Sequence, residues 1–133
     1  SIMGITRGTE KGHIARAALE AIAMRTREIV VEMQKDANTT FKTLKVDGGG
    51  STNDLLMQIQ SDLLQAQVIR PENTETTALG AAFFAGLATG YWPSIESLSS
   101  IWKIDKKFTP KVDTQNDKII DSWRQRISQI TQS

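Results

Sequence analysis

The part of the chain best suited to chemistry is a run of three glycines, Gly48 to Gly50, which follows Asp47 and precedes a polar stretch. Because glycine has no Cβ atom, a ligand can approach the backbone of such a run closely. A helix that begins after it would offer unpaired N–H groups and a partial positive charge, which suit phosphate or ribose oxygens. Ser51, Thr52 and Asn53 add polar side chains beside that terminus. The segment therefore predicts a site for a ligand that carries phosphate or ribose.

The glycine run does not by itself identify such a site. It lacks the lysine of the Gly-x-x-x-x-Gly-Lys-Ser/Thr phosphate loop, and it is not Gly-x-Gly-x-x-Gly. Glycine turns after strands are common, so the alternative is a tight turn in which Ser51 caps the following helix. The residues alone favour neither interpretation over the other.

Other residue types that often do chemistry are present without partners at motif spacing. His13 is the only histidine, and without a nearby carboxylate or cysteine in a motif it is expected to have a structural role. Asp47, Asp54 and Asp62 match no oxygen-ligand loop, and Asp54 and Asp62 are expected to be caps or surface residues. We therefore predict neither a catalytic residue nor a metal ligand in this chain.

The composition is that of an ordinary globular protein. The 133 residues are 39% hydrophobic and 23% charged, and the net charge of +1 gives no electrostatic footprint for nucleic acid or an anionic membrane. The absence of cysteine excludes disulfides and thiolate metal sites and fits a reducing cytoplasm. No signal peptide is evident, and the most apolar run, Ala78 to Ala88, is shorter than the ~20 residues of a membrane span. The first methionine, Met3, follows Ser1 and Ile2, which suggests either an excised fragment of a longer protein or a processed tag.

The glycine run must be positioned by the elements around it. Periodicity and turn residues predict, in order, a helix over Lys11–Lys35 capped by Thr9, a strand over Thr43–Val46, a helix over Leu55–Leu64, a strand over Val68–Arg70 and a helix over Thr76–Thr89. This alternation predicts a parallel pair of strands with helices covering both faces.

The rest of the chain is less regular. We expect a loop with a short helical turn over Pro93–Ser100, an edge strand over Ile101–Phe108 and a last helix over Asp113–Gln132. Gly80 and Gly86 lie inside a predicted helix, where close packing is the favoured explanation. For Gly80 the alternative is that the glycine lets the helix approach a nucleotide cleft. The predicted apolar face of the first helix consists of Ala15, Ala18, Leu19, Ile22, Thr26, Ile29, Val30 and Met33, and that of the last helix consists of Ile119, Ile120, Trp123, Ile127 and Ile130.

Three blocks of sequence carry a family resemblance. Val46–Gly50 followed by Asn53–Asp62 resembles the adenosine motif of glycerol kinases, within the FGGY family of carbohydrate kinases. Thr74–Ala82 is similar to a second block of that family, and Gly4–Ala17 is similar to a third. The blocks keep the family's order and approximate spacing from Gly4 to about Trp92.

The resemblance implies an α/β fold, namely the ribonuclease-H-like domain of the actin, hexokinase and heat-shock ATPase superfamily, helix-rich with a short parallel sheet. Residues 1–133 would form a single partial domain, the C-terminal and adenosine-side one, without its upstream strands. The resemblance places the nucleotide contacts on Gly49 and Asn53, with Asp47, Gly48 and Gly50 as supports of the loop.

The same resemblance implies a function and its partners. The longer protein would transfer the γ-phosphate of ATP to glycerol, with Mg²⁺ held mainly by the nucleotide and the missing domain. It would be a cytoplasmic homo-oligomer, and its glycerol site and catalytic base would lie upstream, so this chain alone should be inactive. The alternatives are another polyol or sugar kinase, of the xylulose or gluconate type, and a non-catalytic nucleotide-binding module.

Overall fold

The computed structural model describes residues 1–111 and 115–131. Its elements, in chain order, are α1 (Lys11–Asp36), β1 (Thr43–Lys45), the 3₁₀ turn η1 (Gly49–Thr52), α2 (Asp54–Leu64), β2 (Gln67–Pro71), α3 (Thr76–Ala88), α4 (Ile95–Leu98), β3 (Ile104–Phe108) and α5 (Gln115–Thr131). Each predicted helix and strand is present in the predicted order. The predicted ends of the last helix, Asp113 and Gln132, lie outside the described residues.

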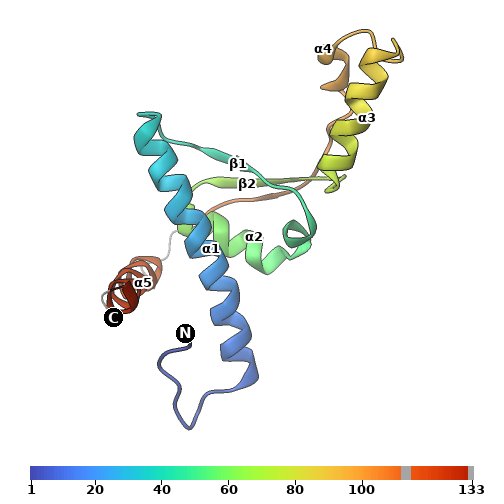
Figure 1. Ribbon diagram of the computed structural model, residues 1–133. Coiled ribbons are helices and arrows are strands. Elements are labelled where there is room, and N and C mark those ends of the chain that lie inside the picture. The colour runs from blue at the N-terminus through green and yellow to red at the C-terminus, as the bar shows by residue number, and fades with distance from the viewer. Residues whose placement is uncertain (112–114, 132–133) are drawn as a thin grey trace.

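The three strands form one mixed sheet in the order β1-β2-β3. β1 and β2 are parallel, with Thr43 opposite Gln67 and Lys45 opposite Ile69, which confirms the predicted pairing. β3 runs antiparallel to β2 and occupies the edge of the sheet, as expected for that strand. The connection from β1 to β2 passes through η1 and α2, so the glycine run lies where β1 ends and α2 begins (Figure 1).

The hydrophobic core lies around α2, which packs between α1 on one side and the strands on the other. Leu56, Met57, Ile59 and Leu63 of α2 are all buried, because both sides of this helix have a partner. The Ser61 hydroxyl, fully buried in the same helix, lies 2.8 Å from the carbonyl oxygen of Ala66 and 3.0 Å from that of Phe108. The other core residues are Ala23, Met24, Val68, Phe108 and Ile120.

The prediction that helices cover both faces of the sheet is wrong for the described residues. Only α2 packs substantially against the strands. α3 and α4 extend away from the layers formed by the sheet, α2 and α1 (Figure 1). The alternation of strands and helices predicted the parallel pairing, but it does not decide how many helices return to the sheet.

The buried face of α1 also differs from the predicted one. Ala23, Met24 and Val30 are buried and Leu19 packs against the core, whereas Ile22 and Ile29 are 53% and 62% exposed. The helix has two apolar stripes, and within the described chain only one of them meets α2. The sequence pattern merged the two because both repeat with helical period.

The start of α1 shows what His13 does. The N-cap is Glu10, one residue after the predicted cap Thr9. The backbone N–H of Glu10 donates to Nδ1 of His13 over 3.0 Å, so the imidazole closes the first turn. Thr9 instead accepts a hydrogen bond from the backbone N–H of Thr6 over 2.9 Å. His13 therefore makes a structural contact, in agreement with the sequence analysis.

The chain exposes far more surface than a compact protein of its size. Its accessible surface is 9446 Å², whereas a compact monomer of this mass should expose roughly 6,900 Å². Large apolar side chains contribute to the excess, including Phe84 of α3 at 76% exposure and Tyr91 at 78%. The exposed apolar side chains lie mainly on α1 and around α3 and α4.

Candidate nucleotide-binding site

The glycine loop begins with a residue that must be glycine. After β1, the N–H of Val46 still donates to the carbonyl of Ile69 over 3.1 Å, and the chain then turns at Gly48. Gly48 has φ +74° and ψ 173°, a backbone conformation that is almost confined to glycine. Its N–H donates to the carbonyl of Thr74 over 2.8 Å, which joins the loop to the segment before α3.

Asp47 makes a second link between the loop and α3. One of its carboxylate oxygens accepts a hydrogen bond from the hydroxyl of Thr76, the first residue of α3. Asp47 and Gly48 therefore tie the glycine loop to the start of α3 from two adjacent positions. This geometry suits the predicted role of Asp47 as a support of the loop rather than a ligand.

Gly49 and Gly50 are glycines for a different reason. Both are exposed and lie in the 3₁₀ turn, and a Cβ atom built on either would meet nothing within 4 Å. Neither backbone N–H has a hydrogen-bond partner among the described residues. The fold thus leaves an open space over two free donors, which is the arrangement that an anionic or polar ligand needs.

The two hydroxyl side chains of η1 are directed toward the turn itself. Ser51 donates to the carbonyl of Gly48 over 2.7 Å, and Thr52 donates to the carbonyl of Gly49 over the same distance. Ser51 is buried as well, with 2% exposure. Both hydroxyl protons are therefore engaged within the loop.

Asn53, and not Ser51, caps α2. Its Oδ1 accepts a hydrogen bond from the N–H of Leu56 over 3.0 Å, the usual geometry of an N-cap. The Nδ2 group of Asn53 has no hydrogen-bond partner in the described part of the chain, and the residue is exposed. One side chain can therefore cap the helix with its oxygen and still offer an amide donor at the start of α2.

Sequence reasoning missed Arg70, which lies in β2 and contacts the loop. Its guanidinium donates to the Ser51 carbonyl and to the Asp54 carboxylate, each over 2.8 Å. Lys106 also bonds Asp54, over 2.6 Å, and the hydrogen bonds from Lys106 and then Arg70 lower the pKa of Asp54. The sequence did contain a signal for this residue. Arg70 is a charged residue in an otherwise apolar strand, and a charge at such a position requires a partner.

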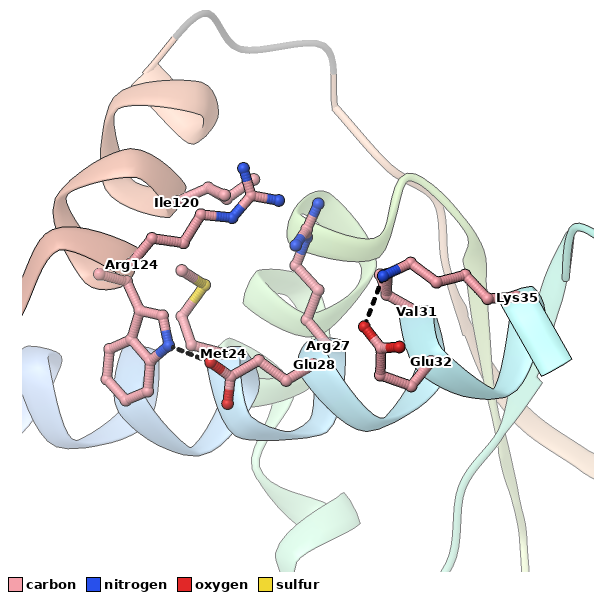
Figure 2. Close-up of a pocket in the computed structure, with 9 residues that line it drawn as sticks. Met24, Arg27, Glu28, Val31, Glu32, Lys35, Ile120 and Arg124 are labelled. Carbon is pink, nitrogen blue, oxygen red and sulfur yellow. Dashed lines mark hydrogen bonds and ion pairs between the residues drawn. The ribbon is translucent and has the colours of Figure 1, made fainter. Parts of the chain in front are cut away.

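A separate pocket of about 270 Å³ lies between α1 and α5, on the side of the core away from the glycine loop (Figures 1 and 2). Its acidic side chains already have partners: Glu32 pairs with Lys35 over 2.6 Å, and Glu28 accepts a hydrogen bond from the Trp123 indole over 2.8 Å. Burial and the neighbouring Arg124 lower the pKa of Arg27. Charges of both signs line this pocket, so its chemistry points to no particular ligand.

Neither a metal centre nor a membrane span is found in the part of the chain that the structure describes. Within residues 1–111 and 115–131, no three histidine, cysteine or acidic side chains gather closely enough to hold a metal ion. No helix in that part of the chain is both long and apolar enough to cross a membrane.

Comparison with known proteins identifies the fold around this loop. The model of the FGGY family of carbohydrate kinases, C-terminal domain, matches residues 1–89, which include η1 and α2. This chain belongs to the FGGY family of carbohydrate kinases. It is also 51% identical over 129 residues to the glycerol kinase of Deinococcus radiodurans, and 49% identical over 127 residues to glycerol kinase 2 of Sulfolobus acidocaldarius. These matches cover 96% and 95% of this chain but 26% of each relative, so the chain spans about a quarter of their length.

Solved structures agree with this assignment. The glycerol kinase of Plasmodium falciparum, crystallised with ADP, matches 97% of the chain and 26% of its own chain, with a TM-score of 0.84 and 35% identity. A xylulose kinase from Lactobacillus acidophilus matches the whole chain and 27% of its own with a TM-score of 0.80, and its 20% identity supports the fold alone. The predicted α/β fold, that of the C-terminal domains of sugar kinases in the actin and hexokinase superfamily, is thereby confirmed, with the sheet corrected to a mixed one.

Proposed function

We propose that this chain, residues 1–133, is the C-terminal and adenosine-side part of a glycerol kinase, which transfers the γ-phosphate of ATP to glycerol. The observation that carries the proposal is the 51% identity to the Deinococcus radiodurans glycerol kinase over 96% of the chain. A match of that extent includes the whole of the glycine loop. The xylulose and gluconate kinases share only 18–23% identity with the chain, which supports no more than a common fold.

We propose that the adenosine end of ATP lies over Gly49 and beside Asn53. The open space above Gly49 admits a ligand to the backbone, and the free N–H groups of Gly49 and Gly50 can donate to its oxygens. Asn53 would contribute its Nδ2 amide while its Oδ1 caps α2. The ADP in the related Plasmodium falciparum structure supports a nucleotide as the ligand.

The remaining parts of the reaction are assigned to upstream sequence. Phosphoryl transfer requires positioned phosphates, Mg²⁺ and a base for the attacking hydroxyl. Among the described residues no three acidic, histidine or cysteine side chains gather to hold a metal ion, so we assign no residue of this chain to Mg²⁺. We therefore place the Mg²⁺ on the nucleotide phosphates and the upstream domain, together with the glycerol pocket. We also expect the longer kinase to be a cytoplasmic homo-oligomer.

A substrate comparison on the longer kinase tests the proposed reaction. ADP release would be followed with ATP and Mg²⁺ in the presence of glycerol, xylulose or gluconate. Glycerol should give the highest kcat/KM by at least tenfold, since sites that hydrogen-bond substrate hydroxyls discriminate strongly among polyols. Faster turnover of xylulose or gluconate would assign the chain to another kinase of the family. ATP binding without turnover of any acceptor would favour a non-catalytic module.

A further inference from the structure

Arg70 is the residue that joins the sheet to the glycine loop. Its Nη1 group donates to two acceptors at the start of α2: the carbonyl of Ser51 and the carboxylate of Asp54, both at 2.8 Å. The carbonyl lies in the 3₁₀ turn, near the end where helical carbonyls lack a partner of their own. The contact therefore fixes the Ser51–Thr52 peptide, one residue beyond the two open glycines.

The arginine is itself held rigidly. Its Nε donates to the Asp105 carboxylate on β3 over 2.7 Å, and its guanidinium lies 5.5 Å from the centre of the Phe108 ring. The side chain is only 12% exposed. The hydrogen bond from Arg70 to Asp105 raises the pKa of Arg70, so the charge is firmly retained. The guanidinium group is planar, so fixing its Nε atom also fixes the directions of its Nη donors.

The loop needs such a restraint. Three consecutive glycines can adopt many backbone conformations, and only one orientation of the peptides directs the Gly49 and Gly50 N–H groups at a ligand. The hydroxyls of Ser51 and Thr52 bond carbonyls inside the turn, so they shape the turn without attaching it to the sheet. Within the described chain, Arg70 makes the side-chain contact from β2 to the turn.

We propose that Arg70 is a positioning residue for ATP. It acts through the Ser51 carbonyl, holds η1 against β2 and so keeps the Gly49 and Gly50 N–H groups in the orientation that receives the nucleotide. This inference rests on the proposed nucleotide site. It assigns to the buried arginine of β2 a role in ATP affinity beyond its ion pairs with Asp54 and Asp105.

The test uses the longer kinase with Arg70→Met and Arg70→Lys. Methionine keeps an unbranched side chain but removes every donor, and lysine keeps the positive charge without the planar guanidinium group. Arg70→Met should raise the KM for ATP roughly tenfold, which corresponds to the loss of a charge-assisted hydrogen bond. The KM for glycerol should change by less than about twofold. Arg70→Lys should fall between Arg70→Met and the wild type. Arg16→Met, at an exposed pair with Glu20, is the matched control and should leave both KM values unchanged.

The outcomes separate positioning from stability. Loss of folded enzyme lowers the apparent kcat but leaves the KM for ATP of the remaining enzyme unaltered, so an ATP KM within twofold of wild type in Arg70→Met overturns the inference. If Arg70→Met is insoluble, Arg70→Lys decides: a rise of about threefold or more in the ATP KM supports positioning, and a smaller one overturns it. Gly49→Val is measured in parallel. If Gly49→Val raises the ATP KM and Arg70→Met does not, the role of Arg70 is refuted but the nucleotide site stands. If neither variant changes the ATP KM, the nucleotide site itself is refuted.

Discussion

Gly48 and Gly49 are neighbours in the chain, but different constraints act on them. Gly48 has a positive φ of +74° that side chains rarely adopt, so the fold itself requires glycine there. Gly49 lies in a 3₁₀ turn, with open space where its Cβ would be. Packing among the described residues gives no reason for a glycine at position 49, whereas the proposed close approach of the nucleotide would give one.

The first prediction exploits this difference. Gly49→Val should change the free energy of unfolding by less than about 1 kcal/mol, because the backbone is helical and the space is open. It should weaken ATP binding at least tenfold, because the branched side chain occupies the space of the nucleotide. Urea unfolding and the ATP KM of the longer kinase measure the two effects.

Gly48→Ala is the matched control, and it should lower the free energy of unfolding by about 1–3 kcal/mol. Wild-type ATP binding by Gly49→Val would show that the site is misplaced. Weaker binding that accompanies unfolding of Gly49→Val would support only the turn interpretation.

The second prediction separates the two atoms of the Asn53 amide. Asn53→Ala removes the cap on the Leu56 N–H and should cost about 0.5–2 kcal/mol of stability as well as ATP affinity. Asn53→Ser keeps a capping oxygen but has no amide donor, so it should retain stability within about 0.5 kcal/mol and still bind ATP more weakly. Thermal unfolding and ATP titration distinguish the variants. If Asn53→Ser and the wild type bind ATP equally well, the Nδ2 group of Asn53 does not contact the nucleotide.

At the scale of elements, α3 contains two glycines with opposite surroundings. A Cβ on Gly86 would lie 2.2 Å from the Trp92 ring, whose position is set by edge-on contacts with Phe83 and Tyr91. A Cβ on Gly80 would meet nothing within 4 Å. The packing explanation therefore holds for Gly86 and fails for Gly80 within this chain.

The third prediction follows from that contrast. Gly86→Ala should destabilise the 133-residue chain by about 1–3 kcal/mol through overpacking against Trp92. Gly80→Ala should stabilise it by about 0.5–1 kcal/mol, because alanine is the better helix former and the site is open. Urea denaturation followed by circular dichroism gives both values. Equal effects of the two substitutions would contradict the packing seen around Trp92.

The contact of α5 with α1 depends on a carboxylate, which gives the fourth prediction. Burial disfavours the charged form of Glu28, but hydrogen bonds from Trp123 and Arg25 outweigh it and lower the pKa of Glu28 from its ordinary value of 4.5. A lowered pKa in the folded state stabilises the contact above about pH 4.5, and this contribution is lost as the pH falls through the folded pKa. The Trp123 indole N–H resonance should therefore shift below pH 4.5.

Glu28→Gln is the control for this titration, because a glutamine oxygen still accepts the indole hydrogen bond but does not titrate. The resonance should lose its acid transition in that variant. A transition of unchanged midpoint and amplitude would assign the titration to another group.

At the scale of the whole molecule, the accessible surface of 9446 Å² and the exposed apolar side chains of α1 and α3 show that many side chains lack partners within the chain. In the proposed site, η1 and the start of α2 would form one wall of the nucleotide pocket. A kinase gains its rate by holding nucleotide, metal and acceptor in one closed cleft. The second wall is therefore expected in the sequence that the longer relatives possess.

The fifth prediction is that the 133-residue chain does not phosphorylate glycerol at a useful rate, although the longer kinase does. Loss of general-base catalysis alone typically costs ~10²–10⁴ in rate, and loss of the opposite wall removes positioning as well. ADP release with glycerol, measured on both proteins, tests this. Turnover by the short chain within tenfold of the longer kinase would require a base and an acceptor site inside it.

The sequence by itself determined the order of the elements, the parallel pairing of β1 with β2 and the position of the glycine loop between β1 and α2. These features depend on local patterns: apolar periodicity, turn residues and the short connections that force parallel strands to cross over through a helix. The family resemblance at Val46–Asp62 was equally local, because a loop motif is contiguous in the chain.

Only the tertiary structure decided which surfaces meet. It placed one apolar stripe of α1 against α2 and left Ile22 and Ile29 exposed, a choice that helical period cannot make because both stripes repeat alike. It gave the cap of α2 to Asn53 and directed the Ser51 hydroxyl into the turn. It also joined Arg70 to a carbonyl 19 positions earlier in the chain, a contact that no local pattern encodes, because its geometry exists only after β2 has paired with β1.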